Sequence, residues 1–132
     1  MIQPSLFLRR ALLADAIFSG AGAIGFTLGA GMFAAFLNLP EALLRETGLF
    51  LVAYAIFVGW LGTRPSMPKA LVAIVVAGNA AWTVASIALL FSGLVTPNLL
   101  GEAVVVAQAI ATGVFAELQY MGLRRSGGAV AA

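Results

Sequence analysis

The chain contains no cysteine and no histidine, and charged residues make up only 9% of it. Without cysteine it can form neither a disulfide bond nor a thiolate nucleophile. Haem sites and the usual zinc or copper sites lose their main ligands when both residue types are missing, and serine or cysteine triads lose a partner. The five carboxylates are scattered, with no two of them three or four residues apart, and no glycine-rich phosphate loop is present. We therefore expect no metal site, no cofactor and no enzymatic activity.

Hydrophobic residues make up 62% of the 132-residue chain, far more than a soluble domain of this size carries. Uncharged apolar runs recur along its length, most of them near the ~20 residues that a helix needs to cross a bilayer. Strands of a membrane barrel would alternate with a period of two, whereas these runs are apolar throughout. The runs predict four membrane-spanning helices with approximate limits 11–37, 47–61, 70–94 and 99–121.

The segments between these runs are short, so we predict a single all-α membrane domain over residues 1–132, an integral membrane four-helix bundle. The linkers NLPEALLRE, GTRPSMPK and VTPN leave no room for a soluble domain. In the last of them, Thr96 is expected to cap the fourth helix and Pro97 to occupy its first position. Residues 122–132 are predicted to form a flexible C-terminal tail.

The two halves of the chain resemble one another. The segment LPEALLRETGLFLVAYAIFV and the later TPNLLGEAVVVAQAIATGV share Pro, Leu-Leu-x-Glu and Ala-x-Ala in the same order. The match is either a true duplication or a coincidence within an apolar background. A duplication would give two units of two spans each in the same orientation, as parallel repeats do. It favours a bundle of two tandem helical hairpins.

Basic residues are unevenly placed about the four predicted spans. One side of the membrane receives most of them: Arg9, Arg10, Arg64, Lys69, Arg124 and Arg125. The other side has only Arg45, close to Glu41 and Glu46. By the positive-inside rule, both termini and the middle loop are predicted to be cytoplasmic. The basic excess is thus an orientation signal, and it gives no reason to expect a nucleic-acid partner.

Three acidic residues fall within the predicted spans: Glu102, which is expected near the first turn of the fourth helix, and Asp15 and Glu117, which lie further from the span ends. Intramembrane ionisable groups usually face the bundle interior and are functional candidates. At 1.5 Å per residue, Asp15 is about 7 Å from Arg10 and Glu117 about 10 Å from Arg124, so both acids are expected in a shallow cytoplasmic layer. They are interpreted either as ion-pair partners of nearby arginines or as a proton or ligand site. The arginines within reach are Arg64, Arg124 and Arg125.

A second group of polar residues is predicted nearer the bilayer midplane. Asn79 lies about 15 Å inside the third span, and Trp82 follows it at helical spacing. Gln108 and Thr112 on the fourth span are expected to supply a hydrogen-bond partner for Asn79. Tyr54, deep in the second span, also needs a partner for its hydroxyl. The candidate proton or ligand site thus comprises Asp15, Asn79, Trp82, Gln108 and Glu117.

Glycines on the first predicted span indicate a helix-packing face. Gly22 and Gly29 share a stripe with Asp15 and Ser19, and Gly25 and Gly29 belong to a small-xxx-small series beside it. Small residues let helix backbones approach closely in lipid. Asp15 is therefore predicted to point at a partner helix, within the chain or across a dimer.

The stretches LLADAIFSG, LNLPEALLR, VVAGNAAWTVASIALL and GVFAELQYMGLRR together resemble a group of small uncharacterised bacterial inner-membrane proteins that are DoxX-like in size and layout. This resemblance implies a four-helix fold and an inner-membrane location, and it supplies no active residues. A weaker resemblance, in LLADAI, is to small multidrug resistance transporters. In that family a membrane-embedded glutamate, at the place of Asp15, exchanges protons for cationic drugs. The aspartate and the parallel repeat depart from that family's pattern.

These observations predict a small non-enzymatic integral membrane protein of the inner membrane. It would either be an accessory component of a larger membrane complex or bind a hydrophobic ligand at a polar patch between its helices. We expect the protein to contact membrane lipids and to form either a homo-oligomer or part of a larger membrane complex. The alternative hypothesis is a proton-coupled transporter of small molecules or cations in which Asp15 or Glu117 carries the proton.

Overall fold

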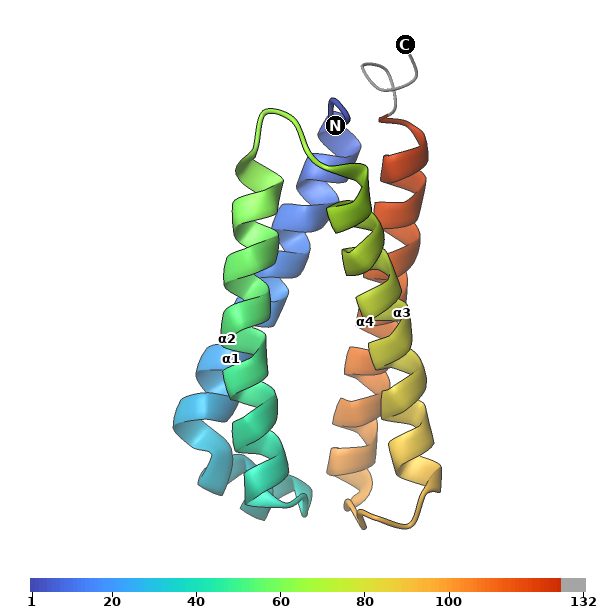
Figure 1. Ribbon diagram of the computed structural model, residues 1–132. Helices are drawn as coiled ribbons and strands as arrows, with labels where there is room; N and C mark the ends of the chain where they lie inside the picture. Colours follow the sequence, from blue (N-terminus) through green and yellow to red (C-terminus); the bar gives the residue numbers. More distant parts are fainter. Residues whose placement is uncertain (127–132) are drawn as a thin grey trace.

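The protein is a bundle of four long helices, seen in a computed structural model that describes residues 1–126 (Figure 1). The helices are α1 (Leu6–Leu37), α2 (Glu41–Thr63), α3 (Lys69–Phe91) and α4 (Leu99–Arg124). Each of them is long and apolar enough to cross a membrane. The prediction of an all-α, four-helix membrane bundle is confirmed.

The helix limits differ from the predicted spans mainly at the ends that carry polar residues. Arg9 and Arg10 were taken to lie outside the first span, but α1 begins at Leu6, where the Ser5 side chain caps it by accepting from the Leu8 N–H at 3.0 Å. Likewise α2 begins at Glu41, directly after Pro40. A helix can extend past the apolar segment into the headgroup region, so a hydropathy limit is not a helix limit.

Two predictions at the ends of α4 need correction. The cap of α4 is Asn98, whose side-chain oxygen accepts from the Gly101 N–H at 2.8 Å, and not Thr96 with Pro97 in first position. Asparagine is the stronger capping residue. The predicted tail 122–132 is helical as far as Arg124, and its positions 127–132 lie outside the described residues.

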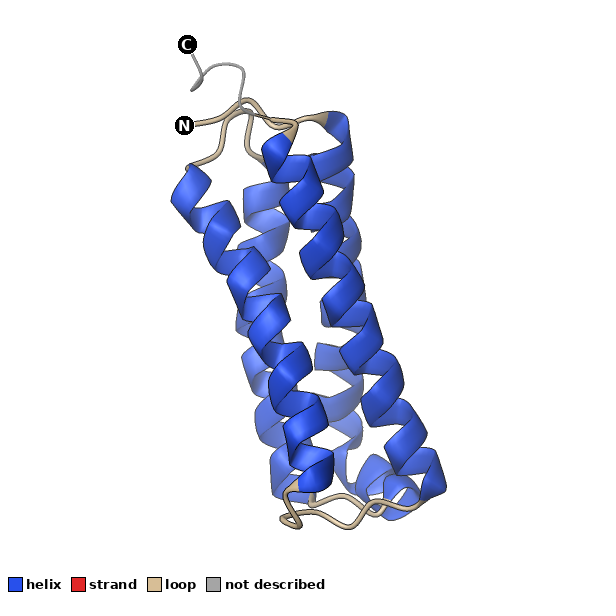
Figure 2. Cartoon of the chain, turned by 90° about the vertical axis from the view of Figure 1, so that its right-hand side faces the viewer, coloured by secondary structure: helices blue, strands red, loops and turns tan. Residues whose placement is uncertain are grey.

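At one end of the bundle lie the N-terminal segment, the α2–α3 loop and the end of α4 (Figure 2). Ile2 and Met67 exchange backbone hydrogen bonds of 2.7 and 3.0 Å, which tie the N-terminal segment to that loop. Ser126 Oγ accepts from the Ser5 N–H at 2.7 Å and ties the same segment to the end of α4. The six basic residues of the orientation argument all belong to this end, here called the basic end.

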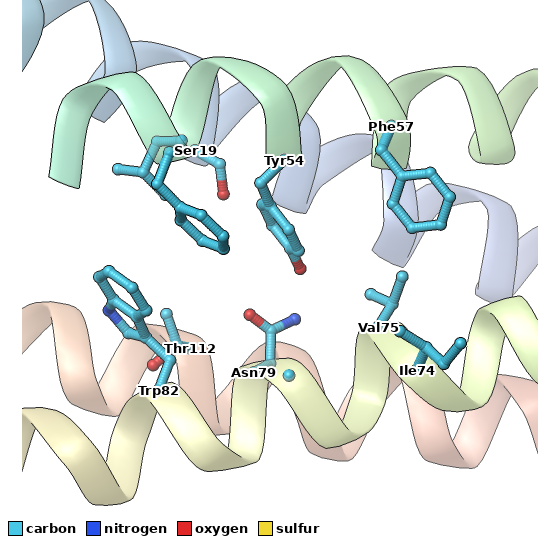
Figure 3. A pocket seen from close by; sticks show the side chains of 11 residues that line it. Ser19, Tyr54, Phe57, Ile74, Val75, Asn79, Trp82 and Thr112 are labelled. Carbon is cyan, nitrogen blue, oxygen red and sulfur yellow. The ribbon is translucent and has the colours of Figure 1, made fainter. Parts of the chain in front are cut away.

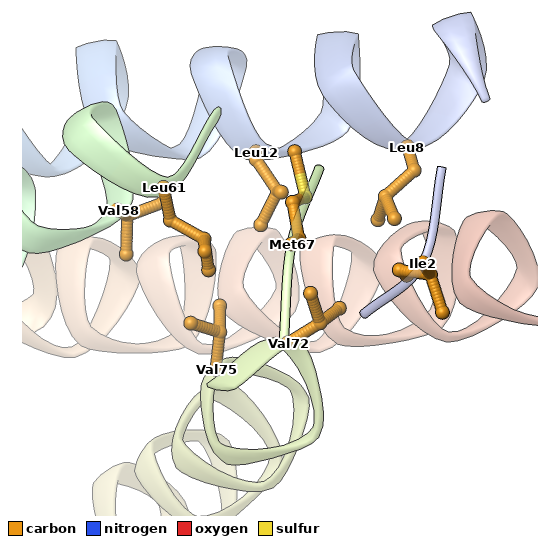
Figure 4. Close-up of a cluster of buried hydrophobic side chains, with 8 residues drawn as sticks. All are labelled: Ile2, Leu8, Leu12, Val58, Leu61, Met67, Val72 and Val75. Carbon is orange, nitrogen blue, oxygen red and sulfur yellow. The ribbon is translucent and has the colours of Figure 1, made fainter. Parts of the chain in front are cut away.

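Two apolar clusters hold the bundle at its opposite ends. The cluster near the basic end draws on the N-terminal segment, α1, α2, the α2–α3 loop and α3, and it comprises Ile2, Leu8, Leu12, Val58, Leu61, Met67, Val72 and Val75 (Figure 4). The cluster at the far end comprises Ala30, Leu37, Leu39, Leu44 and Val105. The middle of the bundle, between these clusters, carries buried polar side chains.

The closest contacts between helices do not involve the α1 glycines that were predicted to form a packing face. They lie at other glycines. A methyl group added at Gly48 would lie 2.6 Å from the Thr27 backbone nitrogen, and one at Gly122 would lie 2.8 Å from the Leu8 Cα. At Gly22 it would meet only the Leu51 side chain, and Gly25 and Gly29 make room chiefly for the Phe33 ring of their own helix. Gly29 also departs from helical dihedral angles, with φ −114° and ψ 20°, and marks a kink in α1.

The two hairpins do not pack symmetrically. Helix α1 packs against α2, α3 against α4, and α1 against α4, whereas α2 and α3 lack such close packing (Figure 1). If the halves were equivalent, as the predicted repeat implies, α3 would approach α2 as closely as α1 approaches α4. The bundle is therefore open on its α2–α3 side.

Candidate functional site

Asp15 is the centre of a polar network to which all four helices contribute. Its side chain is completely buried. Oδ2 accepts hydrogen bonds from Tyr54 Oη on α2 at 2.7 Å, Asn79 Nδ2 on α3 at 2.8 Å and Gln119 Nε2 on α4 at 2.8 Å. Oδ1 accepts from Ser19 Oγ, one turn along α1, at 3.0 Å. Four donors therefore converge on one carboxyl group.

The two amides in this network have orientations that their neighbours dictate. Asn79 Nδ2 donates to Gln119 Oε1 at 2.9 Å as well as to Asp15, so both of its protons face oxygen acceptors. Turning either amide would place oxygen against oxygen. The network consequently has one direction: the protons of these hydrogen bonds point toward the Asp15 carboxyl group or the Gln119 carbonyl.

The predicted ion pairing of Asp15 is wrong. Among residues 1–126 the only ion pair joins Arg45 and Glu41 on the surface. The arginines expected to reach Asp15 instead lie over aromatic rings, Arg64 over Trp60 at 5.3 Å and Arg125 over Phe7 at 4.8 Å. Asp15 lies about 14 Å along α1 from Leu6, the first residue of that helix.

A cavity of about 210 Å³ adjoins the network on the open α2–α3 side (Figure 3). Polar side chains of Ser19, Tyr54, Asn79 and Thr112 line it, together with a larger apolar and aromatic wall. That wall is formed by Phe50, Leu51, Phe57, Ile74, Val75, Gly78 and Trp82. Several wall residues are exposed at the molecular surface, so the cavity is reached from the outside of the bundle between α2 and α3.

Aromatic rings bridge α2 and α3 at this cavity. The Phe50 ring lies parallel to the Trp82 ring, with centroids 5.7 Å apart and an interplanar angle of 6°. The Trp82 Nε1–H donates to Gln108 Oε1 at 2.7 Å, and Gln108 in turn donates to the Val105 carbonyl at 2.9 Å. The Trp82 ring is thus held in place by α4 and presents a flat face toward α2.

The structure brings together four of the five predicted site residues. Asp15 and Asn79 are bonded to each other, and Trp82 and Gln108 form a neighbouring pair beside the same cavity. Glu117 is exposed on the outside of α4 and takes no part. The partners predicted for Asn79 were wrong, because Gln108 bonds Trp82, and Thr112 bonds Thr83 at 2.7 Å.

Three members of the network were not among the predicted site residues. The sequence did indicate that Tyr54 has a hydrogen-bond partner, since a hydroxyl deep in a span needs one. Ser19 lies four residues after Asp15, the spacing that brings side chains together on a helix. Gln119 lies within the fourth predicted span, 99–121, but nothing in the sequence indicated that it faces Asp15.

A second cavity, of about 440 Å³, lies between α1 and α4. Only apolar residues and glycines line it, including Gly22, Gly25, Phe26 and Phe33. It offers no polar group that could orient a ligand. The smaller cavity is therefore the better candidate for specific binding.

Neither a protein-family model nor a curated protein nor a solved structure matches the chain.

Proposed function

We propose that the protein is a non-enzymatic membrane protein that binds a small hydrophobic ligand between α2 and α3. The observation that carries this proposal is the cavity with a polar floor and an aromatic wall, open at the surface that faces lipid if the helices span a membrane. Binding sites of this kind combine apolar walls with a few polar groups that fix orientation. A ligand dissolved in the bilayer would enter sideways, without passing through water.

The volume limits the part of the ligand that is enclosed. An apolar cavity of about 150 Å³ admits one benzene ring, and this cavity measures about 210 Å³. It would hold one substituted ring or a segment of comparable size. A longer ligand would leave its remainder in the lipid between α2 and α3.

The transporter hypothesis has less support. It requires a carboxyl group that substrate and proton reach in turn, but Asp15 does not line the cavity and its oxygens are engaged by four donors. Glu117, the other carrier considered, lies on the outer face of α4. Both acids are thus separated from the space in which a substrate would lie.

We further propose that the basic end of the bundle is cytoplasmic and that the membrane is a bacterial inner membrane. The orientation rests on the six basic residues at that end. The inner-membrane location rests only on the resemblance to small DoxX-like bacterial proteins. Self-association and attachment to a larger complex stay predictions of the sequence.

Orientation can be tested with single cysteines, because the chain has none of its own. Ser66→Cys lies in the α2–α3 loop at the basic end, and Thr96→Cys lies in the α3–α4 loop at the opposite end. In spheroplasts, a membrane-impermeant maleimide should label Thr96→Cys at once and Ser66→Cys only after lysis. The reverse pattern would refute the proposed orientation.

Ligand binding can be tested by filling the cavity. Gly78 lines it, and a methyl group added there would meet nothing within 4 Å. Gly78→Leu is therefore expected to occupy the cavity without loss of thermal stability. Ala80→Leu, on an exposed position of the same helix outside the cavity lining, is the matched control.

The readout is the fluorescence of Trp82, which becomes the only tryptophan once Trp60 is replaced by phenylalanine. In this Trp60→Phe background, 4-bromophenol should quench Trp82 saturably, because bromine quenches an indole at contact distance. The quenching should persist in Ala80→Leu and lose its saturable part in Gly78→Leu. Equal saturable quenching in all three proteins would mean that the cavity is not the binding site.

A further inference from the structure

The polar side chains that line the α2–α3 cavity have no proton left to donate to a ligand. Ser19 and Tyr54 give their hydroxyl protons to Asp15, and Asn79 gives both amide protons to Asp15 and Gln119. The Trp82 N–H goes to Gln108. The donor capacity of these side chains is therefore spent inside the protein.

The Thr112 hydroxyl proton also has an acceptor within the protein. Thr112 Oγ1 and Thr83 Oγ1 lie 2.7 Å apart, and each lies within 3.0 Å of the Ala109 carbonyl. One hydroxyl can donate to that carbonyl while the other donates to its neighbour, which uses both protons. The cavity floor is left with oxygen lone pairs alone.

Asn79 supplies the strongest of these acceptors. The residue is only 4% exposed, and no donor among residues 1–126 contacts its carbonyl Oδ1. Because Nδ2 must face Asp15 and Gln119, Oδ1 points away from them, into the space between α2 and α3 that Figure 3 shows. Asn79 Oδ1 keeps some accessible surface, since Thr27 Oγ1 is the only enclosed side-chain nitrogen or oxygen without a partner among residues 1–126. An acceptor on a largely apolar cavity gains more from a ligand's donor than a solvent-exposed acceptor would.

The same network argues against a cationic ligand. A cation held at membrane depth needs a facing carboxylate or comparable compensation. The Asp15 oxygens are engaged by four donors, and Asp15 does not reach the cavity surface. The acceptors that do reach it are neutral oxygens, which suit a neutral hydroxyl.

The aromatic wall selects for a flat ligand. Phe50 stacks on Trp82 at 5.7 Å and on Tyr54 at 6.2 Å, with interplanar angles of 6° and 18°. The cavity lies against these near-parallel rings, so the ring of a ligand can pack against an aromatic wall. Resting on the proposed function, we infer that the cavity is selective for a neutral phenol, whose ring packs on this wall and whose hydroxyl donates to Asn79 Oδ1.

The test compares two probes of nearly equal size on the same Trp60→Phe protein, so a difference in affinity between the probes cannot come from a difference in folding. In the Trp60→Phe protein, Trp82 quenching is titrated with 4-bromophenol and with 4-bromotoluene, which has a methyl group in place of the hydroxyl. Both concentrations are expressed as those within the detergent micelle. Loss of the donated hydrogen bond to a buried acceptor should weaken 4-bromotoluene binding about tenfold or more.

The possible outcomes distinguish phenol selectivity from the proposed binding function. If the Trp60→Phe protein prefers 4-bromophenol and this preference is lost in Gly78→Leu, both are supported. Equal affinity for the two probes, with saturation lost in Gly78→Leu, overturns the phenol selectivity and leaves the hydrophobic site intact. Absence of saturable quenching by either probe overturns the binding function itself.

Discussion

Asp15→Ala is expected to lower the free energy of unfolding by about 3 kcal/mol, from four lost hydrogen bonds of roughly 0.6–1 kcal/mol each. The substitution removes the only acceptor shared by Tyr54, Asn79 and Gln119, which come from three different helices. Their protons would then be buried without a partner. Unfolding by SDS in mixed micelles measures the change.

The matched control is Glu117→Ala, which removes a carboxyl group from an exposed position of α4. Its effect should stay within about 0.5 kcal/mol, as for other surface substitutions. Asp15→Asn should fall between the two, because it keeps the shape but turns one acceptor into a donor that faces other donors. Equal stability of Asp15→Ala and Glu117→Ala would contradict a central role for the network.

A second large effect is expected at the contact between α1 and α2. Gly48→Ala should destabilise the protein by about 2 kcal/mol or more, since overpacking a close contact costs about 1–3 kcal/mol. The added methyl group would lie 2.6 Å from the Thr27 backbone nitrogen and 2.9 Å from the Phe26 carbonyl carbon. Backbone atoms cannot rotate aside as a side chain can, so the two helices would have to separate.

Gly20→Ala is the control for this prediction. It adds the same methyl group to the interior of α1, where the nearest atom, Ala55 Cβ, lies at an ordinary 3.9 Å. Helix propensity alone should make this variant neutral or more stable by up to about 1 kcal/mol. If thermal unfolding ranked Gly20→Ala below Gly48→Ala, the close contact at Gly48 would not be limiting.

The fold could be predicted from the sequence because the apolar length of each span identifies it as a membrane helix without reference to the other spans. The sequence also indicated that Asp15 faces a partner helix, since Ser19 and Asp15 share a stripe on α1. The sequence did not indicate that α1 begins before its apolar run. In the structure Arg9 is a residue of α1 itself and donates to the Gly62 carbonyl at 2.6 Å, so the helix starts earlier than its apolar run.

The site could not be derived from the sequence because it depends on which helices pack together. In lipid, all faces of a span are apolar, so a polar residue does not reveal the neighbour it meets. Gln119 meets Asp15 only because α1 packs against α4 as well as α2, and it meets Asn79 because α3 packs against α4. The cavity follows from the unequal packing of the two hairpins, which a repeat in the sequence would not predict.

The most direct test of the account is a crystal structure of the protein with 4-bromophenol, in which anomalous scattering locates the bromine. The account predicts a bromine site between α2 and α3, with the ring against Phe50 and Trp82 and the hydroxyl within hydrogen-bond distance of Asn79 Oδ1. Bromine found only in the α1–α4 cavity, or only on the outer surface of the bundle, would contradict it.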